Sequence, residues 1–517
     1  MKVWLLYPDR EYEQKNGYAK KEDIIKDLNF HIIFKMMSRE DEFFYQTASR
    51  VMMKPLLTKR DIEYRHGMMK DCLKCREEFM QIYDIARTAV KRIIEYNDLY
   101  ERRKGNLEAS STVTELLNFM DFLVKQLNAL AFHLEETKDN YASEAMKSFC
   151  ERFEREYGRD RMNKILSELY HLDFWTAGGR LTVSGNCSDG MKLDKLLVNN
   201  VMRNKRRKAA RPMNVVEKMN IKLFRQNAFA LTEDEDRAEA KQLERAALVH
   251  ILKAYDGFIK ELKQFFEQLK LQMAFYAACA GFYKRLDDIG LPMCMPTVTE
   301  SDNGTFIGLY ELTYAIYIHK KPVVNGLRMG DKRLLFVTGA NQGGKSTFLR
   351  SIGVAQVLFQ CGMLVPAEIY SGRIYDNIFT HFTRREDSSM NSGRLEEELK
   401  RMNGIINEVT PDSLLLLNES FASTTEKEGT VIMSGIVRAL AEFGCSIYIV
   451  THLYELARRI YGEELDYTVF LSAERRGDGM RTYKMVPRKP GHTSYGLDLY
   501  EAMIGKITDV DTAADMD

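Results

Sequence analysis

The stretch LLFVTGANQGGKSTFLR (residues 334–350) joins an apolar run typical of a buried β-strand to an amphipathic run typical of a helix. Between them stand Gly339, four residues, then Gly344, Lys345 and Ser346, which is the spacing of a loop that cradles phosphate groups. Glycines let backbone N–H groups converge on an anion, and the helix N-terminus adds partial positive charge. The sequence therefore predicts a nucleotide site, with a plain glycine turn as the structural alternative.

The residues of this loop have expected roles. Lys345 would reach the β- and γ-phosphates, and Ser346 would offer its hydroxyl to Mg²⁺, which prefers oxygen ligands. The residues expected to contact the nucleotide are Gly339, Ala340, Asn341, Gln342, Gly343, Gly344, Lys345, Ser346 and Thr347.

Two further apolar runs lead into polar residues. LLLL at 414–417 is followed by Asn418 and Glu419. IYIV at 447–450 is followed by one residue and then by His452. Because an open α/β sheet binds ligands at the carboxyl ends of its strands, these side chains are candidates for the same site. Glu419 would polarise the attacking water, His452 would sense the γ-phosphate, and Asn418 lacks the charge expected in the magnesium shell, which predicts weaker Mg²⁺ binding or slower turnover. The alternatives are a polar pair that only caps the sheet and a structural histidine.

Composition narrows the class of protein. The chain of 517 residues carries 75 basic and 74 acidic side chains, so any nucleic-acid surface must be a local patch. Its length predicts about two to four domains. Scattered cysteines and the lack of an apolar run of about 18 residues predict a cytoplasmic protein without a membrane span. Cys72 and Cys75 are interpreted as ordinary helical cysteines, with zinc or redox chemistry as the alternative.

Sequence patterns typical of helices precede the glycine loop. Residues 21–170 repeat apolar side chains at helical spacing, which predicts a bundle of long helices with a corner at Pro55. A glycine-rich stretch at 173–199 predicts a small strand or loop excursion. From Thr232 an acidic first turn and a long apolar stripe predict a very long helix, whose stripe is interpreted as a packed core seam in preference to a binding groove. Residues 306–318 are rich in β-formers and predict strands.

A basic cluster follows the excursion. Its members are Lys205, Arg206, Arg207, Lys208 and Arg211. Such a cluster can neutralise a phosphate backbone, while a solvated basic face is the open alternative. Since no aromatic side chains are interleaved, base stacking on the cluster is not expected.

Five segments together resemble the ATPase domain of the MutS mismatch-repair family. They are GANQGGKSTFLR, GMLVPAEIYSGRIYDNIFTHF at 362–382, LLLLNES at 414–420, VTHLYELA at 450–457 and TSYGLDL at 493–499. ASRVMMKPLLTKRDIEYRHGMM at 48–69 resembles the start of that family's helical core domain, and residues 232–285 resemble its lever helices.

The resemblance implies a homodimeric ATPase that binds ATP and Mg²⁺. The implied catalytic residues are Lys345, Glu419 and His452, and the implied metal ligands are Ser346, Asn418 and Glu419. Ser392, in a serine-rich loop, would reach the nucleotide of the partner subunit. The family usually has aspartate at the position of Asn418, and proline and methionine where Ala340 and Gln342 stand.

The implied fold class is α + α/β, with an N-terminal helical core and lever region followed by a P-loop, ABC-type ATPase domain with a mostly parallel sheet. The expected boundaries are 1–150 for the first part of the helical core, 151–231 for a lever or clamp-like excursion with the basic cluster, 232–305 for the long lever helix and 306–517 for the ATPase domain.

The expected form is short, without mismatch-recognition and connector domains, because the likeness to the core domain begins at Ala48. DNA is the expected partner of the helical arms, with structured RNA or a ribosomal particle as alternatives. The alternative function is a nucleotide-gated scaffold with little ATPase activity.

Overall fold

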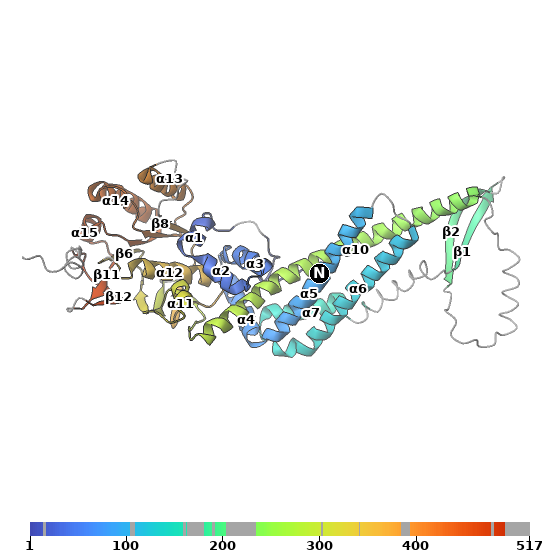
Figure 1. Cartoon of the computed structure of the whole chain (residues 1–517), viewed down its shortest axis with the longest axis horizontal. Coiled ribbons are helices and arrows are strands. Elements are labelled where there is room, and N and C mark those ends of the chain that lie inside the picture. The colour runs from blue at the N-terminus through green and yellow to red at the C-terminus, as the bar shows by residue number, and fades with distance from the viewer. Residues whose placement is uncertain are drawn as a thin grey trace, which may run out of the picture. The chain divides into compact units, whose positions relative to one another are not determined.

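Helices and mixed sheets make up the computed structural model, which confirms the combination of helical and sheet-containing regions predicted from the sequence (Figure 1). The chain divides into two units. Unit 1 is Met1–Trp4, Glu77–Ala142 and Met146–Met273, and unit 2 is Leu5–Arg76, Ser143–Ala145 and Ala274–Asp517. The structure describes residues 1–13, 17–103, 109–158, 162, 180–188, 192–202, 234–300, 303–340, 342–383, 393–476 and 480–491. Within these ranges, no helix is long and apolar enough to cross a membrane.

Unit 1 is mainly helical. Its elements are α5 (Arg76–Arg103), α6 (Ala109–Thr137), η1 (Lys138–Asn140), α7 (Glu144–Tyr157), β1 (Arg180–Ser188), β2 (Lys192–Met202) and the first part of α10 (Asp234–Asp288). Stacked rings of Tyr96 and Phe119, with centroids 4.0 Å apart, join α5 to α6, and Phe153 of α7 lies 6.1 Å from Phe265 of α10. β1 and β2 pair antiparallel. The predicted long helices, strand excursion and very long helix are confirmed, while the four-part division of the chain stays a prediction.

Unit 2 contains a six-stranded sheet in the order β12-β11-β6-β10-β9-β8. Its strands are β6 (Leu334–Thr338), β8 (Asn377–Phe382), β9 (Ser413–Asn418), β10 (Ser446–Val450), β11 (Thr468–Arg475) and β12 (Arg481–Pro487). All neighbouring pairs are parallel except β11 and β12. Every residue of β6, β9 and β10 is buried, as expected when helices cover both faces of a parallel sheet. The apolar runs that predicted strands at 334–338, 414–417 and 447–450 all form strands.

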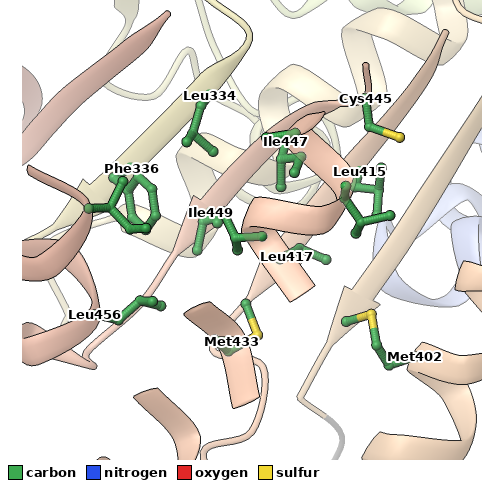
Figure 2. Close-up of a cluster of buried hydrophobic side chains, with 14 of the residues drawn as sticks. Leu334, Phe336, Met402, Leu415, Leu417, Met433, Cys445, Ile447, Ile449 and Leu456 are labelled. Carbon is green, nitrogen blue, oxygen red and sulfur yellow. The ribbon is translucent and has the colours of Figure 1, made fainter. Parts of the chain in front are cut away.

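One face of this sheet packs against three helices in a single apolar cluster (Figure 2). The helices are α13 (Arg394–Ile406), α14 (Glu426–Phe443) and α15 (Tyr454–Gly462). Leu415 and Leu417 of β9 point into the cluster beside Met433 of α14. Leu416 points to the other face, where a Cβ added at Gly353 of α12 (Lys345–Gln360) would lie 2.6 Å from it. The alternation of a strand between two covered faces explains why LLLL carries no polar residue.

The prediction of strands over residues 306–318 is wrong in its second half. β4 (Thr305–Leu309) is a strand, but α11 (Leu312–Ile318) is a helix. The buried carboxylate of Glu311 accepts hydrogen bonds from the backbone N–H groups of Thr313 and Tyr314. This cap satisfies two donors of the first helical turn, and so outweighs the β-propensity of the tyrosines. β4 belongs to a second, four-stranded sheet with β3 (Thr297–Val298), β5 (Asn325–Arg328) and β7 (Ile369–Gly372).

The N-terminal helices of unit 2 are α1 (Lys21–Asp27), α2 (Phe30–Ser38), α3 (Glu42–Met52) and α4 (Lys59–Lys74). The predicted corner at Pro55 is confirmed, because it lies between α3 and α4. Arg65 of α4 is fully buried. Its guanidinium donates to the carbonyl oxygens of Leu6 (3.1 Å) and Cys361 (3.0 Å), and the latter residue caps the C-terminus of α12. A buried cation therefore ties α4 to the negative end of this helix.

Replacing Arg65 by leucine is expected to lower the free energy of unfolding by about 2–4 kcal/mol, because two buried carbonyl groups lose their donor. Urea unfolding of the full chain measures this effect. Arg60→Leu is the control, since Arg60 lies on the same helix and is exposed, and its change should stay within about 0.5 kcal/mol. Equal losses in the two variants would contradict a special role of the buried guanidinium.

Candidate functional site

Three strand ends meet at one edge of the six-stranded sheet. The register pairs Val337 of β6 with Val450 of β10, and Val450 with Asn418 of β9. Since all three strands run in the same direction, the residues that follow them emerge at the same edge. The structure thus brings together the glycine loop (residues 339–346), the pair Asn418 and Glu419, and the segment that begins at Thr451.

The glycine loop has a backbone that favours glycine. Gly339 has φ +117° and Gly344, the N-cap of α12, has φ +88°. A Cβ at Gly339 would lie 2.9 Å from the backbone nitrogen of Ala473 in β11, and a Cβ at Gly343 would lie 2.8 Å from the Cβ of Ala473. Larger side chains would therefore push the loop away from β11. Close approach and left-handed torsions together explain the three glycines.

Lys345 is folded into this loop. Its side chain is buried, and Nζ donates to the carbonyl oxygens of Gly339 (2.8 Å) and Ala340 (3.1 Å). Burial lowers the pKa of Lys345, and the negative charge of Glu419 partly opposes that shift. Ser346 and Thr347 follow in the first turn of α12 and are half-buried. The loop thus encloses a cation at the N-terminus of a helix, which is an arrangement suited to an anion.

Glu419 adopts a conformation that side chains rarely take. Its φ is +53°, and its backbone N–H donates to the carbonyl oxygen of Val450 (2.8 Å). The hydroxyl of Thr383 donates to the carbonyl oxygen of Glu419 (2.6 Å) from the end of β8. The side chain is half-buried. Hydrogen bonds from both sides hold this strained turn, as is common where a side chain must point in one direction.

Asn418 has a buried amide oxygen, Oδ1, without a hydrogen-bond partner among the described residues. An unsatisfied buried acceptor is costly, so this oxygen is suited to accept a hydrogen bond from a bound ligand or its hydration shell. Among the residues that the structure describes, no three His, Cys, Asp or Glu side chains gather to hold a metal ion. Mg²⁺ rarely needs such a group, because it keeps several waters and binds phosphate oxygens. The residues here fit Mg²⁺: Ser346 could offer its hydroxyl oxygen to the ion, and Asn418 could offer its amide oxygen to the hydration shell of the ion.

His452 follows β10 and is exposed. The preceding residue fixes the backbone, since the N–H of Thr451 donates to Val337 (3.2 Å) and its hydroxyl accepts from the N–H of Leu453 (3.0 Å). His452 is thus at the same strand edge as the glycine loop. Its role as a sensor stays a prediction.

Sequence reasoning missed His381, which lies in β8. Its Nδ1 is 2.7 Å from the hydroxyl of Ser420 and its Nε2 is 3.1 Å from the carbonyl oxygen of Glu398. Burial, helped by the nearby charge of Arg401, lowers the pKa of His381 to about 4, so the ring is neutral at pH 7. His381 therefore anchors the residue next to Glu419. The only signal in the sequence was a histidine inside an apolar strand.

A cavity of about 630 Å³ opens beside the glycine loop. Gln342, Gly344 and Thr347 line it on the loop side. Tyr314 of α11 and Tyr483 of β12 contribute aromatic surface elsewhere in the cavity. Its size and mixed lining are those of a small-molecule site.

Some predicted site residues lie outside the described residues. These are Asn341 in the loop, Ser392 in the serine-rich segment, and the basic cluster Lys205, Arg206, Arg207, Lys208 and Arg211. Their predicted roles stay predictions.

A mostly parallel sheet with a glycine loop, a buried lysine and a carboxylate at its carboxyl edge defines an α/β domain whose loop is suited to an anion. Comparison with known protein families assigns the chain more specifically. The family model of MutS domain V matches residues 335–515, and that of the MutS2 N-terminal domain matches residues 58–289. The chain belongs to the MutS family.

Relatives with curated names match a part of the chain. The DNA mismatch repair protein MutS from two strains of Thermus thermophilus is 31% identical to this chain over 179 residues. The match covers 35% of this chain and 22% of each relative. The chain thus matches less than a quarter of the length of these relatives.

Proposed function

We propose that this chain is an ATPase of the MutS type, in which the glycine loop binds the phosphates of ATP. The observation that carries the proposal is the register that brings the buried Lys345 and the turn at Glu419 to one sheet edge. A buried ammonium group with a lowered pKa gains most from an arriving negative charge. Family membership supports the same assignment.

The cavity beside the loop is the proposed place of the nucleoside. Tyr483 has φ +59°, and its carbonyl oxygen accepts a hydrogen bond from Asn325 Nδ2 (3.2 Å). The ring of Tyr483 lies next to Gly344, where an added Cβ would be 3.4 Å from Cδ1. An aromatic ring held at the mouth of the loop suits a flat, apolar base.

The chain's own residues supply the proposed chemistry. Lys345 stabilises negative charge that develops on the transferred phosphoryl group. Glu419 orients the attacking water and accepts its proton, and His452 senses the γ-phosphate from the end of β10. Bound Mg²⁺ would supply charge neutralisation, with Ser346 and Asn418 in its shell.

The proposed assembly is a homodimer through the ATPase regions, in which Ser392 completes the site of the partner subunit. The helical arms, with the basic cluster at 205–211, would bind DNA. The relatives that match carry the name DNA mismatch repair protein, which supports a nucleic-acid partner. The missing charge at Asn418 favours a second candidate function, a nucleotide-gated scaffold with little turnover.

Phosphate release by the full chain tests the proposal and separates the two functions. The assay compares no nucleic acid with homoduplex DNA, branched DNA and structured RNA at a stated salt concentration, because phosphate contacts are salt-dependent. Hydrolysis that DNA stimulates is expected. Hydrolysis no greater than that of Lys345→Ala would favour the scaffold. Hydrolysis insensitive to DNA would remove only the DNA partner, and stimulation by RNA alone would replace it.

Asn418→Asp is expected to tighten the Mg²⁺ dependence of hydrolysis by about three- to tenfold, because a carboxylate adds the charge that a hard cation favours. The Mg²⁺ concentration that gives half-maximal hydrolysis measures this shift. Asn407→Asp, an exposed position after α13, adds the same charge away from the site and should leave the value unchanged. An unaltered Mg²⁺ dependence in Asn418→Asp would mean that the amide does not limit metal binding.

A further inference from the structure

The N-terminal helix α1 ends in a buried carboxylate, Asp27, which is 6% exposed. Its position is outside the ranges 58–289 and 335–515 that the two family models match. α1 nevertheless belongs to unit 2 and lies beside β8 of the six-stranded sheet (Figure 1). Burying a carboxylate is costly unless it is paired, so its partners indicate what the residue does.

Asp27 contacts three different elements of this sheet domain. Its backbone carbonyl oxygen accepts from Arg350 Nε of α12 (3.1 Å). Its carboxylate oxygen Oδ2 accepts from the hydroxyl of Thr380 in β8 (2.8 Å) and from Arg401 Nη2 in α13 (3.2 Å). One residue is thus bonded to the helix after the glycine loop, to the strand that leads to Thr383, and to α13.

Both terminal nitrogens of the Arg401 guanidinium have hydrogen-bond partners. Nη1 donates to the carbonyl oxygen of Phe382, the last residue of β8 (2.9 Å), while Nη2 meets Asp27. The side chain is 13% exposed, and Asp23 is a more distant acidic neighbour at 3.9 Å. A planar guanidinium with fixed partners on both branches defines the position of α13 against β8.

Close packing also joins the end of α1 to α12. A Cβ at Gly353 of α12 would lie 2.9 Å from Cδ1 of Leu28, the residue after Asp27. The end of α1 therefore fits against α12 without space for a side chain. Movement of α12 relative to α13 must break a hydrogen bond of Asp27 or disturb this contact, because packed interfaces shift between discrete arrangements.

We propose that Asp27 is a positioning residue that fixes α13 relative to α12, and so sets the geometry between the two half-sites of one chain, the glycine loop for its own nucleotide and the segment before α13 for that of the partner subunit. This inference rests on the proposed function, because α12 begins at the glycine loop and α13 follows the segment that contains Ser392. Through Asp27, the helices α1–α4 are linked to the relative position of these half-sites. α1 thus acts as part of the ATPase region and not only as part of a helical arm.

Amide hydrogen exchange of the full chain without nucleotide tests the linkage directly. In Asp27→Asn, exchange in α13 is expected to rise by about tenfold, because Arg401 loses its charged acceptor. Because the same residue bonds Arg350 through its backbone carbonyl oxygen, the rise is expected to extend to the turn of α12 around Arg350. Glu22→Gln is the matched control, since it removes an exposed carboxylate from the same helix, and should leave both regions unchanged. A rise confined to α1, or an equal rise throughout unit 2, would overturn the proposal.

Steady-state kinetics, with kcat expressed per chain that binds a fluorescent ATP analogue, distinguish a positioning role from a loss of folded protein. Asp27→Asn is expected to lower kcat by about tenfold with KM within about twofold, because misplaced half-sites affect the reacting geometry more than ATP binding. Asp27→Glu retains a charged acceptor and should recover part of kcat. A parallel change of kcat and KM, or no recovery by glutamate, would overturn the positioning role.

The two proposals fail in different ways. If the wild-type chain does not hydrolyse ATP, the proposed function fails, and the hydrogen-exchange pattern still decides whether Asp27 links α12 to α13. If Asp27→Asn does not fold, Arg401→Lys carries the same test, because an ammonium group cannot bond Asp27 and Phe382 with a fixed fork. Unchanged exchange in α12 and α13 of Arg401→Lys would then overturn the linkage.

Discussion

Lys345→Ala is expected to lower ATP hydrolysis by about a hundredfold or more and to weaken ATP binding. The ammonium group is enclosed by the loop, where Nζ donates to the carbonyl oxygens of Gly339 and Ala340. Burial lowers the pKa of this group, because the enclosed ammonium is less solvated than a lysine in water. A phosphate chain would replace the missing solvation, and alanine offers no charge. Phosphate release and titration with a fluorescent ATP analogue measure the two effects.

The control for this variant is Lys427→Ala, which removes an exposed lysine from the first turn of α14. Its hydrolysis and binding should match those of the wild-type chain. Unchanged ATP binding by Lys345→Ala would contradict the placement of the phosphates in the glycine loop. A folded variant is required for this conclusion, and circular dichroism of both variants establishes that.

Glu419→Gln is expected to lower hydrolysis by about a hundredfold or more while ATP remains bound. Glutamine has nearly the same shape, so the backbone turn at φ +53° and its hydrogen bonds to Val450 and Thr383 are retained. Only the carboxylate that can accept a proton from water is lost. Single-turnover hydrolysis and the affinity for the fluorescent analogue separate the chemical step from binding.

Glu442→Gln provides the comparison, since it changes an exposed carboxylate near the end of α14. If Glu419→Gln loses ATP binding together with hydrolysis, Glu419 maintains the structure of the site and is not the catalytic base. If hydrolysis persists at the wild-type rate, another group activates the water. His452 would be the first candidate, because it follows the neighbouring strand β10.

Local patterns predicted most elements of the fold. Continuous apolar runs such as LLFVT and LLLL predicted β6 and β9 correctly. These strands are covered on both faces, so they have no solvent-facing positions that would favour polar residues. The error at residues 312–318 has a local cause as well, since Glu311 caps a helix that β-propensity alone does not predict. The sheet order β12-β11-β6-β10-β9-β8 could not be predicted this way, because it depends on contacts between segments distant in the chain.

The candidate site likewise contains residues that the sequence indicated and residues that it did not. Spacing alone indicated Gly339, Gly344 and Lys345, because a phosphate-binding loop is a short continuous segment. No such signal pointed to Thr383 or His381. Thr383, directly after β8, bonds the backbone of Glu419, and His381 of β8 bonds Ser420, so both contacts depend on the pairing of β8 with β9. Spacing also could not show that the amide oxygen of Asn418 lacks a partner among the described residues.

Local sequence patterns were sufficient to predict which segments become buried strands, where the long helix α10 lies, and which loop has the glycine spacing of a phosphate-binding loop. Each of these depends on periodicity, glycine torsions or charge within a few residues. Tertiary contacts alone bring Glu419 to the same sheet edge as the loop of Lys345, and bring Asp27 to Arg350, Thr380 and Arg401. The reason is physical: hydrogen bonds and ion pairs between distant segments form only when strand register and helix packing fix their separation.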